Sequence, residues 1–175
     1  GNDSTVDSAA VIVLPDPPSV SLTISPSSMY VGNSATITYS ATNSPTSCTA
    51  SGNWANTGSK STTSGNHTES TGTLSTAKTY LYSLSCTNAG GTGFQNNVPL
   101  TVTVPPAPVV SISVNPIATT VGNSVTITYS ATNSPTSCTA GGNGWSGAKS
   151  TTSGAHTQTS GALNVAQTYT FSLSC

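Results

Sequence analysis

Residues 79–86 read "TYLYSLSC", and residues 168–175 read "TYTFSLSC". In both stretches every second residue is apolar or cysteine, and serine or threonine fills most of the positions between them. Successive side chains of a β-strand point to opposite faces of the sheet, so this alternation predicts a strand with one buried face. Each stretch places its cysteine, Cys86 or Cys175, on the apolar face, where we expect it to be buried.

The two stretches belong to an internal repeat. Residues 20–48 and 110–138 are identical at 20 of 29 positions, at an offset of 90. The copies stay aligned through "KSTTSGNHT" (60–68) and "KSTTSGAHT" (149–157), where the offset becomes 89. A repeat of this length predicts two domains of similar size.

Short alternating segments, separated by clusters of Gly, Asn, Ser and Pro, run through both copies. With no amphipathic helical pattern between them, they are typical of a β-sandwich. We therefore expect an all-β chain in four parts: an N-terminal extension (1–18), a first sandwich (19–104), a Pro-rich linker (105–109) and a second sandwich (110–175).

The composition excludes several classes of partner. Only 4% of the 175 residues are charged and the net charge is −1, so nothing attracts nucleic acid or an anionic membrane. No apolar stretch approaches the roughly 20 residues of a membrane-spanning helix. Four cysteines in a chain that is more than one third Ser and Thr indicate an oxidising, extracellular setting.

The second copy differs from the first at its end. After Cys86 the first copy continues through "TNAGGTGFQNNVPLTVTV", whereas the sequence ends at Cys175, so we expect the second domain to lack its final strand. The N-terminal extension carries a donor-type strand over residues 8–14. At an offset of 90 its alternating residues match that final strand as follows: Ala10 with Leu100, Ile12 with Val102, and Leu14 with Val104.

These two features predict assembly between copies. An unpaired sheet edge is a template for another strand, and the apolar segment 8–14 needs a partner. We expect it to complete the second domain of the next copy, giving a head-to-tail, open filament. The expected acceptor groove consists of Val110, Ile112, Val114, Tyr169, Phe171 and Leu173.

A second interpretation explains the same ends. The chain is then a two-repeat segment of a longer, continuous repeat protein, in which the next strand follows along the polypeptide. Both interpretations predict a string of sandwiches.

The motifs resemble those of a bacterial immunoglobulin-like tandem repeat family of secreted and surface proteins. The resemblance rests on "NSPTSCTA" in residues 43–50 and 133–140, the tryptophan that follows, and the two "SLSC" strands. It implies immunoglobulin-like sandwiches in an extracellular stalk, adhesin, fibre, or spacer beside an enzyme, and no single activity. The permuted ends, the low charge, and a leucine where a tyrosine corner would stand depart from the pattern.

The resemblance also implies a disulfide pairing within each repeat. Cys48 would pair with Cys86, and Cys138 with Cys175. The sequence itself leaves the question open, because four cysteines allow three pairings.

No set of residues indicates catalysis. The four carboxylates, Asp3, Asp7, Asp16 and Glu69, form no repeated pair for acid–base chemistry, and no C-x2-C or G-x-S-x-G motif occurs. We expect no catalytic residue, no metal site and no cofactor, and therefore a protein that is not an enzyme.

Two kinds of residue raise the possibility of glycan contacts. Trp54 and Trp145 favour packing in the core or a turn, but exposed indoles would offer a stacking surface for sugars, which defines an alternative glycan-binding module. Asn2 and Asn66 begin the sequons "NDS" and "NHT", which are acceptors for N-glycans. The expected partners are copies of the chain itself, together with glycans or a host or cell surface.

Overall fold

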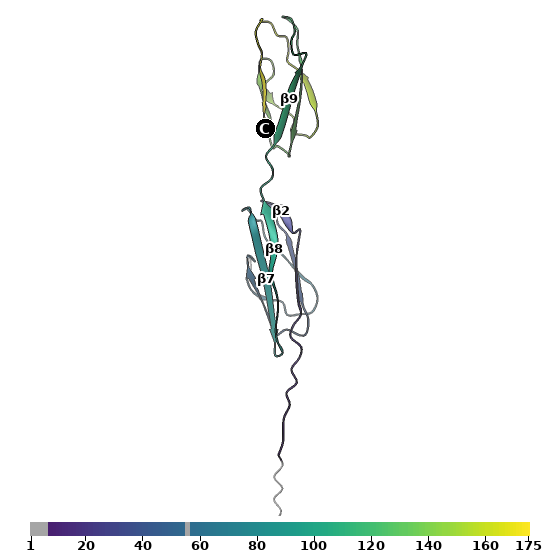
Figure 1. Ribbon diagram of the computed structural model, residues 1–175, viewed down its shortest axis with the longest axis vertical. Helices are drawn as coiled ribbons and strands as arrows, with labels where there is room; N and C mark the ends of the chain where they lie inside the picture. Colours follow the sequence, from purple (N-terminus) through teal and green to yellow (C-terminus); the bar gives the residue numbers. More distant parts are fainter. Residues whose placement is uncertain (1–6, 55–56) are drawn as a thin grey trace, which may run out of the picture. The chain divides into compact units, whose positions relative to one another are not determined.

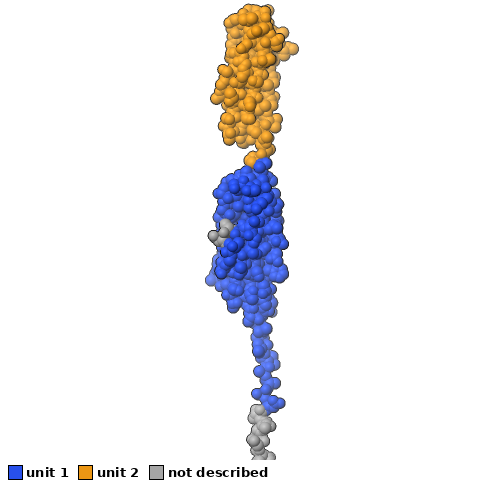
Figure 2. Space-filling view, turned by 90° about the vertical axis from the view of Figure 1, so that its left-hand side faces the viewer, with its two compact units in different colours: residues 1–104 blue, residues 105–175 orange. Residues whose placement is uncertain are grey.

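The computed structural model describes residues 7–54 and 57–175. The chain divides into two compact units, unit 1 (residues 1–104) and unit 2 (residues 105–175), shown in blue and orange in Figure 2. The described residues form fourteen β-strands and no helix, so the prediction of an all-β chain is confirmed. Within the described ranges, no helix is long and apolar enough to cross a membrane.

Unit 1 contains two sheets, consistent with a β-sandwich. One is antiparallel, with the order β1 (Val20–Ser25), β3 (Thr36–Ala41), β6 (His67–Ser70). The other has five strands in the order β2 (Ser28–Tyr30), β8 (Gly91–Thr103), β7 (Lys78–Asn88), β4 (Ser47–Gly52), β5 (Gly58–Lys60). Figure 1 shows β2, β8 and β7 side by side, with β8 between the other two.

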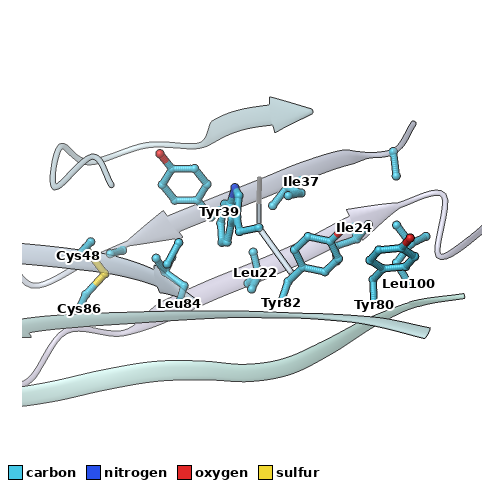
Figure 3. Packing of buried hydrophobic residues seen from close by; sticks show 14 of the residues in the cluster. Leu22, Ile24, Ile37, Tyr39, Cys48, Tyr80, Tyr82, Leu84, Cys86 and Leu100 are labelled. Carbon is cyan, nitrogen blue, oxygen red and sulfur yellow. A yellow bond between two sulfur atoms is a disulfide. The ribbon is translucent and has the colours of Figure 1, made fainter. Parts of the chain in front are cut away.

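The core of unit 1 lies between its sheets because alternating residues of the strands point inward. On β7, Tyr82, Leu84 and Cys86 are fully buried, whereas Ser83 and Ser85 between them are partly exposed. Figure 3 shows the buried side chains of β7 directed toward the strands of the facing sheet. The alternation in "TYLYSLSC" therefore marks the inner face of β7.

Unit 2 repeats most of this arrangement. Its first sheet has the order β13 (His156–Thr159), β10 (Thr126–Thr132), β9 (Val109–Asn115), the counterparts of β6, β3 and β1. Its second sheet has the order β12 (Gly147–Ala148), β11 (Thr139–Gly142), β14 (Phe171–Ser174), the counterparts of β5, β4 and β7. Among residues 105–175 no strand corresponds to β2 or β8.

The N-terminal extension has no secondary structure in its described part, residues 7–19. The sequence predicts a strand over residues 8–14, and the structure shows none there. A strand requires a hydrogen-bonded neighbour, and within the described chain this segment has none. Segment 8–14 thus has the apolar pattern of a strand but lacks the backbone hydrogen bonds to a neighbour that would make it one.

Candidate functional site

Strand β8 closes the sandwich of unit 1. It pairs antiparallel with β7 on one side and parallel with β2 on the other. Its inward-facing residues Leu100 and Val102 are 0% and 2% exposed, whereas Val104, just beyond the strand, is 66% exposed. Two side chains of β8 therefore fill this part of the core, and the third apolar residue of the pattern does not.

Unit 2 has an open groove at the corresponding place. The groove has a volume of about 690 Å³. Its apolar lining includes Val114, Val121, Val125, Leu163, Tyr169 and Phe171. These residues are the counterparts of unit 1 residues that pack in the core, Ile24, Val31, Ala35, Leu74, Tyr80 and Tyr82. The groove is the space that β8 occupies in unit 1.

The groove differs from the one expected from the sequence. Three residues of the expected set, Val114, Tyr169 and Phe171, line this groove. Val110, Ile112 and Leu173 do not line it. Ile112 and Leu173 pack against the core of unit 2, and Leu173 pairs with Ala140, two residues after the disulfide-bonded Cys138.

Sequence reasoning missed the other groove residues, among them Val121, Val125 and Leu163. All three lie outside the described strands, and of the three only Val125 continues an alternating pattern, that of Ile127 and Tyr129. The internal repeat was the signal that could have found them, since their counterparts in unit 1 pack beside Leu100 and Val102 in the same core.

The backbone on both sides of the groove forms no strand ladder in unit 2. Residues 168–170 are not in a strand, although their counterparts 79–81 belong to β7. Residues 118–120 are likewise outside any strand, although their counterparts form β2. An inserted strand would therefore find a ladder partner on each side, as β8 does in unit 1.

The most exposed apolar segment of the described chain lies in the N-terminal extension. Val11, Ile12 and Val13 are 84–88% exposed, and Leu14 is also exposed. Four consecutive large apolar side chains in water are unfavourable, which makes this segment the candidate occupant of an apolar groove.

The proline-rich residues that follow this segment pack closely on unit 1. They lie against the hairpin between β7 and β8, where glycine leaves room for their backbone. A Cβ atom on Gly90 would collide with the carbonyl group of Pro15, and one on Gly93 with that of Pro18. We call this contact the linker clamp.

Asparagine side chains hold the linker clamp. Asn88 Nδ2 donates to the carbonyl oxygen of Asp16 at 2.8 Å, and Asn43 Nδ2 donates to that of Pro17 at 2.8 Å. In unit 2, Asn133 Nδ2 donates to the carbonyl oxygen of Ala107 at 2.7 Å. The second and third bonds correspond at an offset of 90, so each unit holds the chain that enters it in the same way.

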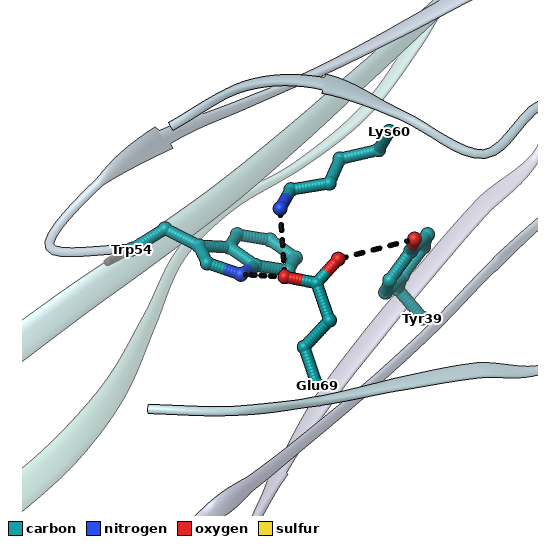
Figure 4. Close-up of polar contacts among 4 residues, drawn as sticks. All are labelled: Tyr39, Trp54, Lys60 and Glu69. Carbon is teal, nitrogen blue, oxygen red and sulfur yellow. Dashed lines mark hydrogen bonds and ion pairs between the residues drawn. The ribbon is translucent and has the colours of Figure 1, made fainter. Parts of the chain in front are cut away.

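A polar cluster in unit 1 surrounds Glu69 (Figure 4). Its Oε2 atom accepts hydrogen bonds from Lys60 Nζ at 2.7 Å and from Trp54 Nε1 at 2.9 Å. Its Oε1 atom accepts one from the Tyr39 hydroxyl at 3.4 Å. Lys60 Nζ also lies 4.7 Å from the centre of the Trp54 ring, within range of a cation–π interaction.

The cluster lowers the pKa of Glu69. Burial alone would raise the pKa of this carboxyl group. The hydrogen bonds from Lys60 and Trp54, the charge of Lys60 and the Tyr39 hydroxyl outweigh burial and bring the pKa below its ordinary value of 4.5. Glu69 is therefore the structural counter-ion of Lys60, whose side chain is only 4% exposed.

Unit 2 holds a neutral version of this cluster. Gln158 replaces the glutamate, and its Oε1 atom accepts a hydrogen bond from Trp145 Nε1 at 2.7 Å. Lys149 Nζ donates to the carbonyl oxygen of Ser146 instead. Sequence reasoning did not connect Lys60 with Glu69, because strands β5 and β6 belong to different sheets.

The cysteines are paired within each repeat. Cys48 is bonded to Cys86, and Cys138 to Cys175, the pairing that the resemblance implies. Cys86 is fully buried, whereas Cys175 is partly exposed.

Both tryptophans are buried in the cores. Trp54 is 3% exposed and Trp145 is 2% exposed. The indole NH of each is used in the clusters described above, and each ring packs edge-on or tilted against a tyrosine, Tyr39 or Tyr129. This burial argues against the hypothesis that the two rings stack on sugars.

The remaining predicted residues show no shared site. Asn66 is exposed in the turn before β6. Asn2 and Asp3 lie outside the described residues. Asp7 and Asp16 are described, and no group of three potential metal ligands occurs within residues 7–54 and 57–175.

No known protein family matches the chain, and the comparison with curated proteins finds no match. The resemblance to bacterial immunoglobulin-like repeats therefore rests on the sequence motifs alone. The fold, the open groove and the exposed N-terminal segment are the features that bear on function.

Proposed function

We propose that the protein is a non-enzymatic structural subunit of an extracellular, pilus-like filament. Each subunit consists of two tandem immunoglobulin-like sandwiches. The apolar segment 8–14 of one copy enters the groove of unit 2 in another copy and forms the strand that corresponds to β8.

The observation that supports this proposal is the match between groove and segment. In unit 1 the same space is filled by a strand of the same alternating pattern, at an offset of 90 from segment 8–14. Two backbone edges without a strand ladder flank the groove, and the segment itself has no ladder partner among the described residues. Insertion of one segment 8–14 would fill the groove, pair both backbone edges and give the segment its hydrogen-bond partners.

The side chains can supply a substantial driving force. Ile12 is 84% exposed and Leu14 is 58% exposed before insertion. Burying a large aliphatic side chain contributes roughly 1.5–3 kcal/mol. Each backbone hydrogen bond along the two edges would add about 1 kcal/mol net.

The geometry of this contact favours a filament. Donor and acceptor are different surfaces, so the contact is heterologous and need not close into a ring. The two disulfides are compatible with an extracellular location. The motifs of the bacterial surface repeat family support the same location.

Assembly of the purified full chain tests the proposal. We expect filaments by electron microscopy and a mass that grows with concentration. A chain lacking residues 1–14, and a full-length Ile12→Asn/Leu14→Asn double variant, should both stay monomeric. An Asp7→Ser variant, changed beside the donor segment but not within its apolar pattern, is the matched control and should assemble.

Two results would overturn the proposal. Filaments of the truncated chain would show that segment 8–14 is not the donor. A wild-type chain that stays monomeric at high concentration would favour the continuous repeat protein, in which the groove is filled by residues that follow along the same polypeptide.

A further inference from the structure

We propose that Ile12 and Leu14 fill the two buried positions of the unit 2 groove. This inference rests on the proposed strand exchange and specifies its register. The buried positions are those that Leu100 and Val102 occupy in unit 1. The offset of 90 in the sequence would instead place Ala10 and Ile12 there.

Three registers bring segment 8–14 into the groove. In the aligned register, Ala10 replaces Leu100 and Ile12 replaces Val102, and Leu14 takes the exposed place of Val104. In the shifted register, two residues further along, Ile12 replaces Leu100 and Leu14 replaces Val102. A one-residue shift points Val11 and Val13 inward. All three are open to the segment because it is apolar on both faces.

The size of the groove distinguishes the registers. In unit 1, seven residues of the core have counterparts that line the groove: Ile24, Met29, Val31, Ala35, Leu74, Tyr80 and Tyr82. Together they have 32 side-chain atoms other than hydrogen, and their counterparts in unit 2 have 31. Leu100 and Val102 supply seven such atoms. A strand that fills unit 2 to the same density therefore needs eight.

Only the shifted register supplies eight. Ile12 and Leu14 together have eight side-chain atoms, Val11 and Val13 have six, and Ala10 and Ile12 have five. Protein interiors are close-packed and tolerate volume-conserving replacements far better than voids. A void of Leu→Ala size weakens an interaction by roughly 30-fold to several thousand-fold.

The contacts at each of the two buried positions favour the same register as the atom count. Val102 pairs in register with Met29 of β2, and the counterpart of Met29 is the smaller Thr119. Leu14 in place of Val102 offsets this loss. At the other position, Tyr80 pairs with Leu100, and its counterpart Tyr169 is unchanged. Ala10 beside Tyr169 would leave the larger void.

The shifted register shortens the connection between subunits. Ala107, the residue held by Asn133, stands five positions after Val102. Pro17, the residue held by Asn43, stands three positions after Leu14. The connection between copies is then two residues shorter than the linker inside the chain, roughly 6–7 Å of extended backbone.

The shift also places Pro15 where Thr103, the last residue of β8, stands in unit 1. Proline lacks an N–H group there, and the end of a strand is where this loss is tolerated. A change of two residues in linker length has little effect on the free energy of assembly, whereas a void in the core costs much more. Packing therefore decides the register.

Substitutions in the full chain test this register. Leu14→Asn should raise the concentration at half-assembly by about 100-fold or more, and Leu14→Ile, the matched control, should leave it within a few-fold. Val11→Thr and Val13→Thr should also stay within a few-fold, since these side chains then point outward, at the places of Pro99 and Thr101 of β8. All four changes lie in a segment without contacts to either core, and hydrogen exchange of β3 and β10 checks that folding is unchanged.

The outcomes separate the register from the exchange itself. Leu14→Asn filaments that form like the wild type would overturn this inference while keeping the proposed function, and would establish the aligned register if Val13→Thr also assembles. Loss of assembly on Val13→Thr, with Leu14→Asn assembling, would establish the one-residue shift. A wild-type chain that does not assemble would overturn both proposals.

Discussion

The carboxylate of Glu69 should stabilise unit 1 above acidic pH, and Glu69→Gln isolates its charge. The variant keeps an oxygen that can accept a hydrogen bond from Trp54 Nε1, as Gln158 does for Trp145 in unit 2. In the wild type the buried ammonium group of Lys60 lies 2.7 Å from Glu69 Oε2, and the variant leaves it without this counter-charge. A hydrogen bond to a charged group is worth roughly 1.5–3 kcal/mol. We expect unit 1 to lose about 2 kcal/mol at pH 7, which is roughly 8–16 °C in Tm for a unit of this size.

The loss should depend on pH. Because the pKa of Glu69 is lowered in the folded state, the charged carboxylate stabilises folding above the ordinary value of 4.5. This contribution is lost as the pH falls from that value through the lowered pKa of the folded state. The difference in unfolding free energy between wild type and Glu69→Gln should therefore be constant near neutral pH and approach zero in acid.

Native-state hydrogen exchange resolves the two units and provides the control. Amides of β3 and β6 report on unit 1, and those of β10 and β13 report on unit 2, where Gln158 is already neutral. We expect faster exchange in unit 1 alone. Equal protection of unit 1 in wild type and Glu69→Gln at pH 7, or a difference that persists unchanged in acid, would refute the assigned role of the ion pair.

Two further variants probe the core and the linker clamp. The Tyr82 hydroxyl is buried without a hydrogen-bond partner among the described residues, and Phe171 is its counterpart. Tyr82→Phe should thus leave unit 1 equally stable or up to about 1 kcal/mol more stable in urea unfolding. A loss of stability of more than about 1 kcal/mol would show that the Tyr82 hydroxyl does have a hydrogen-bond partner. Gly90→Ala places a Cβ atom against the carbonyl group of Pro15 and should release the linker clamp, lowering the heteronuclear NOE of the Asp16 amide while Thr92→Ala does not. An unchanged NOE in Gly90→Ala would show that this contact does not fix the linker.

The sequence predicts the elements whose pattern is local. The alternation around Tyr82 and Leu84 identifies β7 and its inner face, because period-two burial depends only on neighbouring residues. The repeat places the boundary between the units near residue 105.

The sequence does not predict features that depend on partners distant along the chain. Segment 8–14 has the pattern of a strand but lacks a ladder within the described residues, so its state depends on another strand. Glu69 and Lys60 meet only because two sheets face each other. The groove residues Val121 and Leu163 lie in irregular segments, where burial follows no period.

Hydrogen exchange of the full chain as a function of concentration tests the strand exchange most directly. We expect the amides of residues 9–14 and 118–120 to become protected together as concentration rises, since one inserted strand pairs with the unit 2 backbone. Exchange of both segments at unprotected rates at every concentration would contradict the account. Protection that does not change with concentration would also contradict it, because the strand would then come from the same chain.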